Sequence, residues 1–153
     1  PSVNSYKRLV PGWEAPVYIS WARYNRSVLV RVPPGKELRT RLEYRPTDGS
    51  CNFYLAFAAI LAAGIDGVRK KLQPDDPIEE NIYTMDVEER RKRGVGLLPE
   101  NLGEALKELG KNKILQDALG HKFYEKYVEI KTQEWRDFNT AVHEWERNRY
   151  IDV

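Results

Sequence analysis

The sequence of 153 residues contains one cysteine, one methionine and two histidines, and no long apolar run. A single cysteine cannot form an internal disulfide, and Cys51 is assigned no chemistry. The 25 lysines and arginines nearly balance the 23 acidic residues, which excludes a global attraction to nucleic acid or acidic lipid. Residues 55–65 are interrupted by Gly64 and followed by Asp66, so we expect no membrane-spanning helix.

The two histidines, His121 and His143, show no ligand-like spacing to a carboxylate or thiol, so we interpret them as helix-surface or packing residues. The length suits one domain with a hydrophobic core. The chain begins at Pro1, without a methionine and without a charged leader followed by an apolar stretch. We therefore expect a cytoplasmic protein, with residues 1–153 forming one piece of a larger polypeptide.

The first half of the chain predicts strands. Alternation of apolar and polar residues places Val17, Ile19 and Trp21 on one side, facing a core. A turn at residues 33–36, which contain two prolines and a glycine, separates the second and third strands. Because the connections are short, we expect adjacent antiparallel strands over residues 17–24, 26–32 and 39–45.

The second half predicts helices. Residues 52–72 repeat apolar side chains every three or four positions and are apolar nearly all round, which predicts a helix buried across the back of the sheet. Residues 73–96 have no such period and are interpreted as an excursion anchored by Ile82 and Tyr83. Asn101 begins one further helix, and residues 121–149 form the last. The expected fold is α+β, a short antiparallel β-sheet backed by a buried helix and followed by two further helices.

The most unusual stretch is the strand over residues 39–45. Alternation places three arginines around one carboxylate, Glu43, whereas Leu42 and Tyr44 point the other way. Arginine grips carboxylate or phosphate with a planar fork, so this face suits oxyanions. Residues two apart on a strand lie about 7 Å apart, a spacing that permits a metal beside an anionic group. A simple solvated sheet face is the alternative.

Several motifs, in register along the chain, carry a family resemblance. They are NSYKRLVPGWEAP at residues 4–16, NRS at 25–27, RLEYR at 41–45, Asn52 with YLAFAA at 54–59, NIY at 81–83, EW at 134–135 and RY at 149–150. This pattern resembles the C-terminal part of the catalytic domain of a prokaryotic type I glutamine synthetase. The resemblance covers essentially residues 1–153 and implies that the N-terminal domain and the first part of the catalytic domain are absent.

The resemblance implies an activity. In that family ATP phosphorylates the side-chain carboxylate of L-glutamate, and ammonia displaces phosphate from the γ-glutamyl phosphate to give L-glutamine. Metals, Mg²⁺ or Mn²⁺, and arginines offset the repulsion between the two anionic substrates. The family also implies a homo-oligomer, a double-ring dodecamer with active sites at subunit boundaries, and no nucleic-acid or membrane partner. Because the segment lacks the other metal ligands of the family, it is expected to be inactive alone.

The resemblance assigns four arginines to substrates. Arg8 and Arg45 match arginines that bind glutamate. Arg26 matches the arginine that contacts the transferring phosphoryl group, between glutamate and ATP, where a fixed cation favours the charge-spread transition state. Arg31 matches a contact to a nucleotide phosphate.

The resemblance also assigns two carboxylates and one further cation. Glu43 matches a ligand of the second metal ion, which prefers hard oxygen donors. Glu14 lies in the flap over glutamate, where it helps to form the ammonium site and accepts a proton. Lys36 and Arg39 compete for one basic position near ATP, because the length of this loop differs from the family.

Three alternatives stay open from the sequence. A superfamily relative could join glutamate to an organic amine, and a non-catalytic module could bind nucleic acid or another polyanion through the arginine face. Tyr83 lies where some bacterial relatives are adenylylated, but the following Thr84, Met85 and Asp86 depart from the usual sequence. An anchoring role for Tyr83 is therefore preferred.

Overall fold

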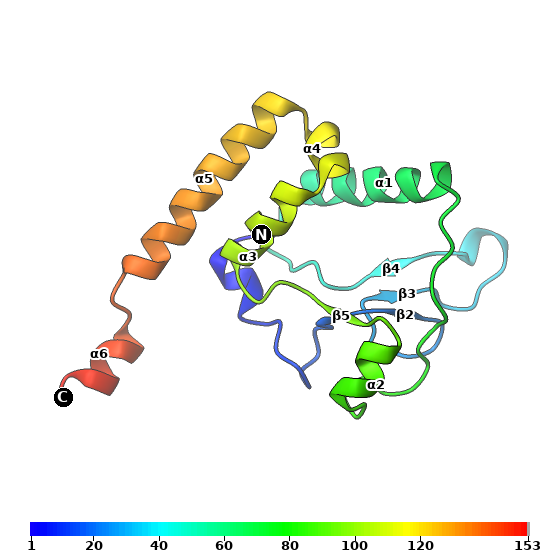
Figure 1. Ribbon diagram of the computed structural model, residues 1–153, viewed down its shortest axis with the longest axis horizontal. Helices are drawn as coiled ribbons and strands as arrows, with labels where there is room; N and C mark the ends of the chain where they lie inside the picture. Colours follow the sequence, from blue (N-terminus) through cyan, green and yellow to red (C-terminus); the bar gives the residue numbers. More distant parts are fainter. Residues whose placement is uncertain (153) are drawn as a thin grey trace.

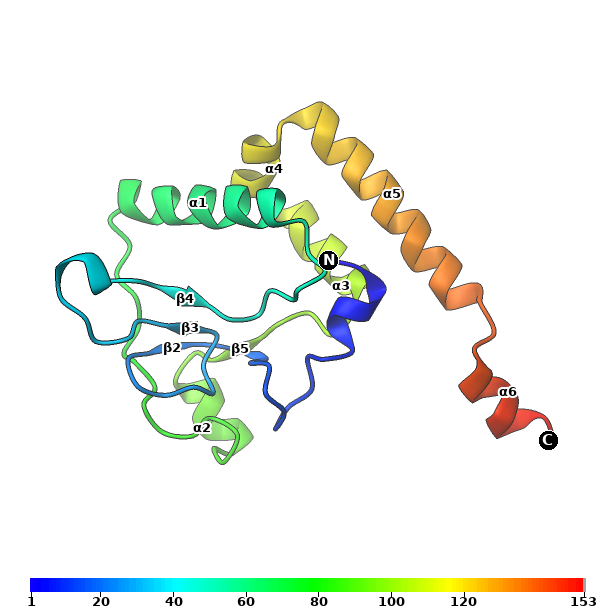
Figure 2. The same ribbon diagram turned by 180° about the vertical axis from the view of Figure 1, so that it is seen from behind.

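The computed structural model describes residues 1–152 and joins a region of short strands and loops to a set of helices (Figure 1, Figure 2). The described strands are β1 (Tyr18–Ile19), β2 (Trp21–Ala22), β3 (Val30–Arg31), β4 (Glu43–Tyr44) and β5 (Gly96–Leu97). The α-helices are α1 (Phe53–Arg69), α2 (Val87–Lys92), α3 (Leu102–Lys111), α4 (Lys113–Leu119), α5 (His121–Thr140) and α6 (Glu144–Tyr150), and the 3₁₀-helices are η1 (Val3–Tyr6) and η2 (Glu37–Arg39). The expected α+β class is confirmed.

The strands form two small sheets. One has the order β2-β3-β4, with β2 parallel and β4 antiparallel to β3, and the other pairs β1 antiparallel with β5. The expected adjacency is confirmed, but the expected antiparallel pairing of the first two strands is wrong. The continuous strand over residues 17–24 is also wrong, because the chain changes sheet at Ser20. Consequently Ile19 is 50% exposed, whereas Tyr18 and Ala22 are buried.

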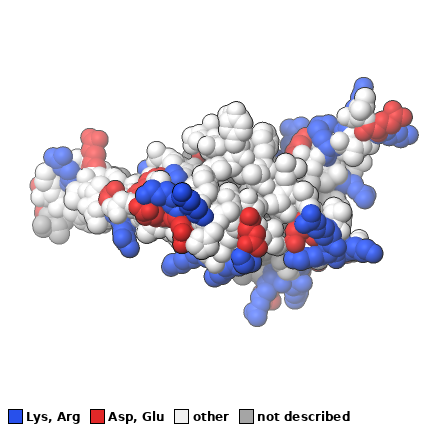
Figure 3. All heavy atoms as spheres, turned by 90° about the horizontal axis from the view of Figure 1, so that it is seen from above, with Lys and Arg blue, Asp and Glu red and all other residues white. Residues whose placement is uncertain are grey.

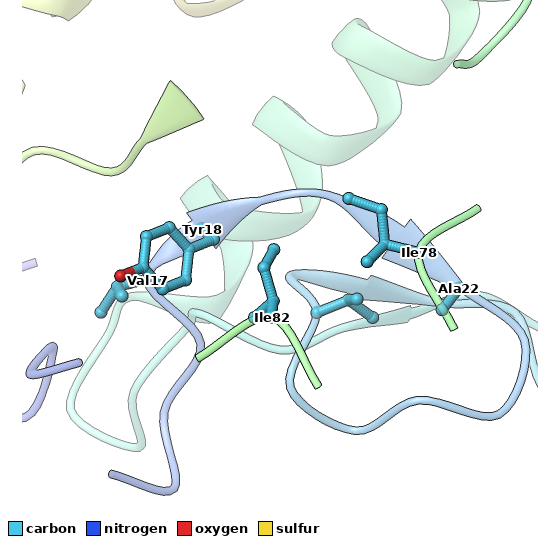
Figure 4. Packing of buried hydrophobic residues seen from close by; sticks show 6 residues of the cluster. Val17, Tyr18, Ala22, Ile78 and Ile82 are labelled. Atoms are coloured by element: carbon cyan, nitrogen blue, oxygen red, sulfur yellow. The ribbon is translucent and has the colours of Figure 1, made fainter. Parts of the chain in front are cut away.

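The core lies where the strands meet the segment before α2. Its six buried members come from segments some sixty residues apart in the sequence: Val17, Tyr18, Ala22, Val28, Ile78 and Ile82. Figure 4 labels all of them except Val28. The expected anchoring by Ile82 is confirmed, and Tyr83 packs against the same cluster. Ile78 is a further anchor, and its amide donates to the Trp21 carbonyl at 2.9 Å. The segment is therefore part of the domain's core.

Helix α1 runs alongside the three-stranded sheet and packs against α4 (Figure 1). The expected burial of this helix is wrong, because no residue in it is buried and Phe57 and Val68 are 61% and 80% exposed. A helix that is apolar nearly all round needs cover on every side, and the described chain supplies α4 along only part of it. Figure 3 shows a broad uncharged area in the middle of the surface seen from above.

Asn and Asp side chains define where the helices begin. Asn52, Asp86, Asn101 and Asn112 each accept a hydrogen bond from the amide three residues later, which satisfies one free donor of the first turn. The predicted helix start at Asn101 is confirmed. Asn112 is extended, so it ends α3 and starts α4, which makes two helices where one was expected.

The last helix is shorter than expected. Helix α5 ends at Thr140, and α6 begins after the extended residues Ala141 and His143. His143 packs against the Phe138 ring, as a packing residue should, whereas the exposed His121 lies 3.2 Å from Glu125. No helix of the described residues is long and apolar enough to cross a membrane.

Candidate oxyanion and metal site

Glu43 lies between two arginines, of which strand alternation predicted Arg41 but not Arg31, which belongs to the neighbouring strand. The antiparallel register sets Arg31 of β3 opposite Glu43 of β4. Arg31 Nη1 lies 3.0 Å from Glu43 Oε2, and Arg41 Nη2 lies 3.0 Å from Glu43 Oε1. The hydrogen bond from Arg31, with that from Arg41, lowers the pKa of Glu43, so its carboxylate is ionised at neutral pH.

The shared face of Arg39, Arg41, Glu43 and Arg45 is only partly confirmed. Arg41 bonds Glu43, but Arg39 belongs to η2 and not to the strand. Arg45 directs its Nη1 to the Val28 carbonyl at 3.2 Å. Of these three arginines, Arg41 alone has a side-chain bond to Glu43 within residues 1–152.

The turn before β4 explains why Arg39 leaves the strand. The backbone closes so tightly at Gly35 that a Cβ there would lie 2.6 Å from the Arg39 carbonyl oxygen. Glu37 has a φ of 52°, in the left-handed region that few residues adopt. Residues 36–39 form this turn and not part of the strand. Lys36 and Arg39 are therefore exposed in the connection between β3 and β4.

Arg8 lies beside the chain that leaves β4. Its Nη1 donates to the Pro46 carbonyl at 2.6 Å. This bond holds the segment after η1 against Pro46, the residue that follows Arg45. Arg8 and Arg45 are both half-buried, and each is held by a main-chain oxygen. The two arginines assigned to one substrate are thus brought to the same stretch of backbone.

Glu14 is exposed on a loop that begins with Gly12, whose φ is +87°. The Tyr83 hydroxyl spans this loop, at 3.4 Å from the Trp13 carbonyl and 3.3 Å from the Ala15 carbonyl. Tyr83 therefore anchors the residues on both sides of Glu14, which agrees with the preferred interpretation of this tyrosine. Burial raises the pKa of its hydroxyl, which stays a donor.

Arg26 lies on an exposed turn whose supports sequence reasoning missed. The Glu79 carboxylate accepts hydrogen bonds from the amides of Arg23, Tyr24 and Asn25. The Asn25 side chain accepts from Ser27 and donates to the carbonyls of residues 78 and 80. Apart from the bonds between Asn25 and Ser27, these bonds connect positions more than fifty residues apart, so no local periodicity indicated them.

Glu43 can contribute one oxygen-rich ligand to a metal site. Mg²⁺ and Mn²⁺ take several oxygen donors, and the described residues contain no group of three or more His, Cys, Asp or Glu side chains that could hold an ion. Both Glu43 oxygens already bond arginines. A metal bound to Glu43 would therefore be repelled by two positive charges nearby. Within the described residues, Glu43 therefore fits a metal as the source of one of the several ligands that such an ion needs.

These features define a domain that fixes arginines near a carboxylate, an arrangement whose chemistry suits oxyanions. The family described as "Glutamine synthetase, catalytic domain" matches residues 1–150. The chain belongs to this family, as the sequence motifs implied.

Curated relatives place the likeness more finely. The chain is 54% identical over 151 residues to a glutamine synthetase of Thermotoga maritima and 53% identical over 151 residues to one of Methanocaldococcus jannaschii, covering 99% of this chain in both cases. It spans 34% and 33% of their lengths. Among solved structures, the ADP complex of GmaS has a TM-score of 0.84 at 35% identity, covering 100% of this chain and 35% of that one.

Proposed function

We propose that this chain is the C-terminal third of a glutamine synthetase subunit, and that the complete subunit uses ATP to join ammonia to L-glutamate. A complete subunit means a polypeptide in which this chain follows the other two thirds found in the relatives. The observation that carries the proposal is the Arg31–Glu43–Arg41 arrangement, held by a chain about half identical to glutamine synthetases along its whole length.

The chemistry requires fixed positive charge. The γ-carboxylate of glutamate attacks the terminal phosphorus of ATP, ADP leaves, and ammonia then displaces phosphate from the γ-glutamyl phosphate. Both substrates are anions, so cations that are already oriented lower the barrier most. Arg8 and Arg45 would hold glutamate, Arg31 would bind a nucleotide phosphate, and Arg26 would stabilise the charge that develops on the transferring phosphoryl group.

The remaining assignments complete the site. Glu14, exposed on its loop, would form part of the ammonium site and accept the proton that the attacking nitrogen loses. Glu43 would supply one carboxylate ligand to Mg²⁺ or Mn²⁺, and that ion, when bound, neutralises phosphate charge. Lys36 and Arg39 both remain candidates for the basic contact to ATP, since both are exposed in the same turn.

The proposed assembly is a double-ring dodecamer in the cytoplasm. The exposed apolar side chains of α1 and α6 support an assembly of this kind, because Phe57, Trp145 and Tyr150 are each more than half exposed in the chain alone. Light scattering of the complete subunit tests the assembly. A mass of one subunit at micromolar concentration contradicts it.

The decisive experiment measures phosphate release that depends on glutamate, ATP, ammonia and Mg²⁺. We expect turnover from the complete subunit and none from the isolated chain, because one carboxylate cannot complete a metal site. Turnover by the isolated chain contradicts the proposed division of the site. A complete subunit that is assembled yet inactive contradicts the proposed function.

The same assay decides the nature of the amine. Ammonia competes with methylamine or ethylamine as the second substrate, and kcat/KM is compared between them. We expect a higher value for ammonia, since the curated relatives at about 50% identity are glutamine synthetases. A higher value for the organic amine would reassign the chain to a ligase for glutamate and amines.

A further inference from the structure

The Glu79 carboxylate binds three consecutive backbone amides. The Arg23 amide lies 2.8 Å from Oε1, and the amides of Tyr24 and Asn25 lie 3.0 and 3.2 Å from Oε2. Successive N–H groups that converge on one anion require a particular set of backbone angles. The carboxylate therefore sets the conformation of the chain that leads into Arg26.

Glu79 is itself mounted on a rigid segment. Its neighbour Ile78 and the nearby Ile82 are 4% and 0% exposed, and both belong to the core. Figure 4 shows Ile78 beside Ala22 of β2. Because core side chains have little freedom, the position of the Glu79 backbone is fixed relative to β2.

The far side of the turn is held by the same segment. Asn25 Oδ1 accepts from the Ser27 amide at 2.8 Å, and the Asn25 amide group donates to the carbonyls of Ile78 and Glu80. The Ile82 amide in turn lies 3.3 Å from the Ser27 hydroxyl. The backbone is thus fixed immediately before and immediately after Arg26.

Arg26 differs from its surroundings. Its side chain is exposed, and within residues 1–152 its guanidinium makes no hydrogen bond or ion pair. A turn with this many bonds, carrying a cation that uses none of them, is built to present that cation to something outside the chain. Exposed arginines that only solubilise a surface need no such support.

We propose that Glu79 is a positioning residue that acts through Arg26, by fixing the turn at residues 23–25 so that the guanidinium meets the transferring phosphoryl group. This inference rests on the proposed function. Loss of the Glu79 charge would leave the turn free to adopt several conformations, and a misplacement of about 1 Å at a reacting centre can cost about 100-fold in rate.

The lowered pKa of Glu79 agrees with this role. The hydrogen bond from the Arg23 amide, together with those from the next two amides, lowers the pKa of Glu79 and keeps it ionised at neutral pH. An amide side chain in its place would present an NH₂ group to at least one backbone N–H. The variant Glu79→Gln therefore removes the support with little change in size.

The main experiment compares Glu79→Gln with Glu80→Gln in the complete subunit. Glu80 is the adjacent exposed carboxylate, and its side chain pairs on the surface with Arg93 at 3.2 Å. We expect kcat per folded subunit to fall about 10- to 100-fold in Glu79→Gln, with KM for glutamate within twofold, and to stay within twofold of wild type in Glu80→Gln. An unchanged kcat in Glu79→Gln overturns the inference.

A double-mutant cycle separates positioning from a general structural role. If Glu79 acts through Arg26, adding Glu79→Gln to Arg26→Ala lowers kcat by less than twofold further. If the two losses multiply, Glu79 acts independently and the inference is wrong. Should Glu79→Gln fail to assemble, Glu79→Asp enters the same cycle, since it keeps the charge but is one methylene too short to reach all three amides.

Hydrogen exchange tests the backbone step without relying on activity. The amides of Arg23, Tyr24 and Asn25 should exchange faster in Glu79→Gln than in wild type or Glu80→Gln. Equal exchange overturns the inference even if the proposed function is correct. If wild type shows no glutamate-dependent phosphate release, or Arg26→Ala has no effect on it, the proposed function or the role of Arg26 fails, while faster exchange still supports the fixing of the turn.

Discussion

The strand-and-loop region and the helical region differ in how far each completes its own packing. In the first region, residues 15–29 together with Ile78 and Ile82 contain nearly all the buried hydrophobic side chains, whereas Leu102 is the only one in α1 or in α3 to α6. The helices instead expose large apolar side chains such as Phe57 and Trp145. Within the described residues, the chain therefore holds several of its arginines through its own backbone but leaves most of the apolar surface of its helices uncovered.

The largest expected effect tests the centre of the first region. In the complete subunit, Glu43→Ala removes the proposed metal ligand and leaves Arg31 and Arg41 without their partner, so we expect phosphate release to fall about 100-fold or more. Glu37→Ala removes an exposed carboxylate from the nearby turn and serves as the matched control.

The same variant tests the polyanion alternative. If the arginine face binds polyanions, Glu43→Ala should tighten the binding of polyphosphate or single-stranded DNA, with a strong dependence on salt. If Glu43→Ala binds the polyanion more tightly and releases phosphate at the wild-type rate, the proposed role of Glu43 as a metal ligand is wrong.

The next effect contrasts the core with the exposed helix. Ile82→Ala should lower the free energy of unfolding of the isolated chain by about 2–5 kcal/mol, because a fully buried side chain leaves a cavity. Val68→Ala, at an 80% exposed position of α1, should change it by about 0.5 kcal/mol or less. Urea unfolding followed by circular dichroism measures both, and equal losses contradict the division into two regions.

A smaller effect tests where the helical region does pack. A Cβ on Gly103 of α3 would lie 2.4 Å from Nε1 of Trp135 on α5, so Gly103→Ala should cost about 1–3 kcal/mol. Gly110 lies in the same helix, and a Cβ there would meet the Tyr124 hydroxyl at 3.9 Å. Gly110→Ala should therefore stabilise the helix by up to about 1 kcal/mol. Thermal unfolding that ranks the two variants the other way contradicts this packing of α3 on α5.

The smallest effect concerns pH. Hydrogen bonds from the Arg23 amide to Glu79 and from Arg31 to Glu43 lower both pKa values from the ordinary 4.5. A lowered pKa contributes stability above the ordinary value, and this contribution is lost as pH falls from there through the lowered one. We expect an unfolding midpoint that is nearly constant from about pH 7 to pH 5 and falls below about pH 4.5.

The variant Glu79→Gln sharpens this test. Its unfolding midpoint should be lower at neutral pH and should fall less steeply below about pH 4.5, whereas Glu88→Gln, at an exposed position of α2, should follow wild type. A midpoint that falls between pH 7 and 5 in wild type would point to groups other than these carboxylates.

Local signals predicted the elements whose causes are local. The cap at Asn101, the apolar period of α1 and the alternation around Glu43 are each visible within a few residues, and the structure has a helix start, a helix and a strand there. The end of α5 at Thr140 was not predicted, because the apolar period of residues 121–149 continues through the extended residues before α6.

The sequence proposed which residue types form the candidate site, but it did not predict which contacts hold them. Sequence motifs proposed Arg8, Arg26, Arg45 and Glu14, because a motif records residue types at fixed spacings. Glu79 gave no signal, because a carboxylate that binds backbone amides imposes no requirement on the residue types it holds. The prediction that Arg39 lies on the strand was wrong. The alternating pattern of residue types extends through residues 36–39, although the backbone forms a turn there that closes tightly at Gly35.

The α+β class and the family could be predicted before any coordinates, because they depend on residue types and short spacings. The same motifs proposed the residues of the site. Three features required the three-dimensional structure. They are the sheet that each half of residues 17–24 joins, the carbonyls that orient Arg8 and Arg45, and the carboxylate that holds the turn before Arg26. Contacts between distant segments depend on how the whole chain packs, and a one-dimensional pattern contains no record of them.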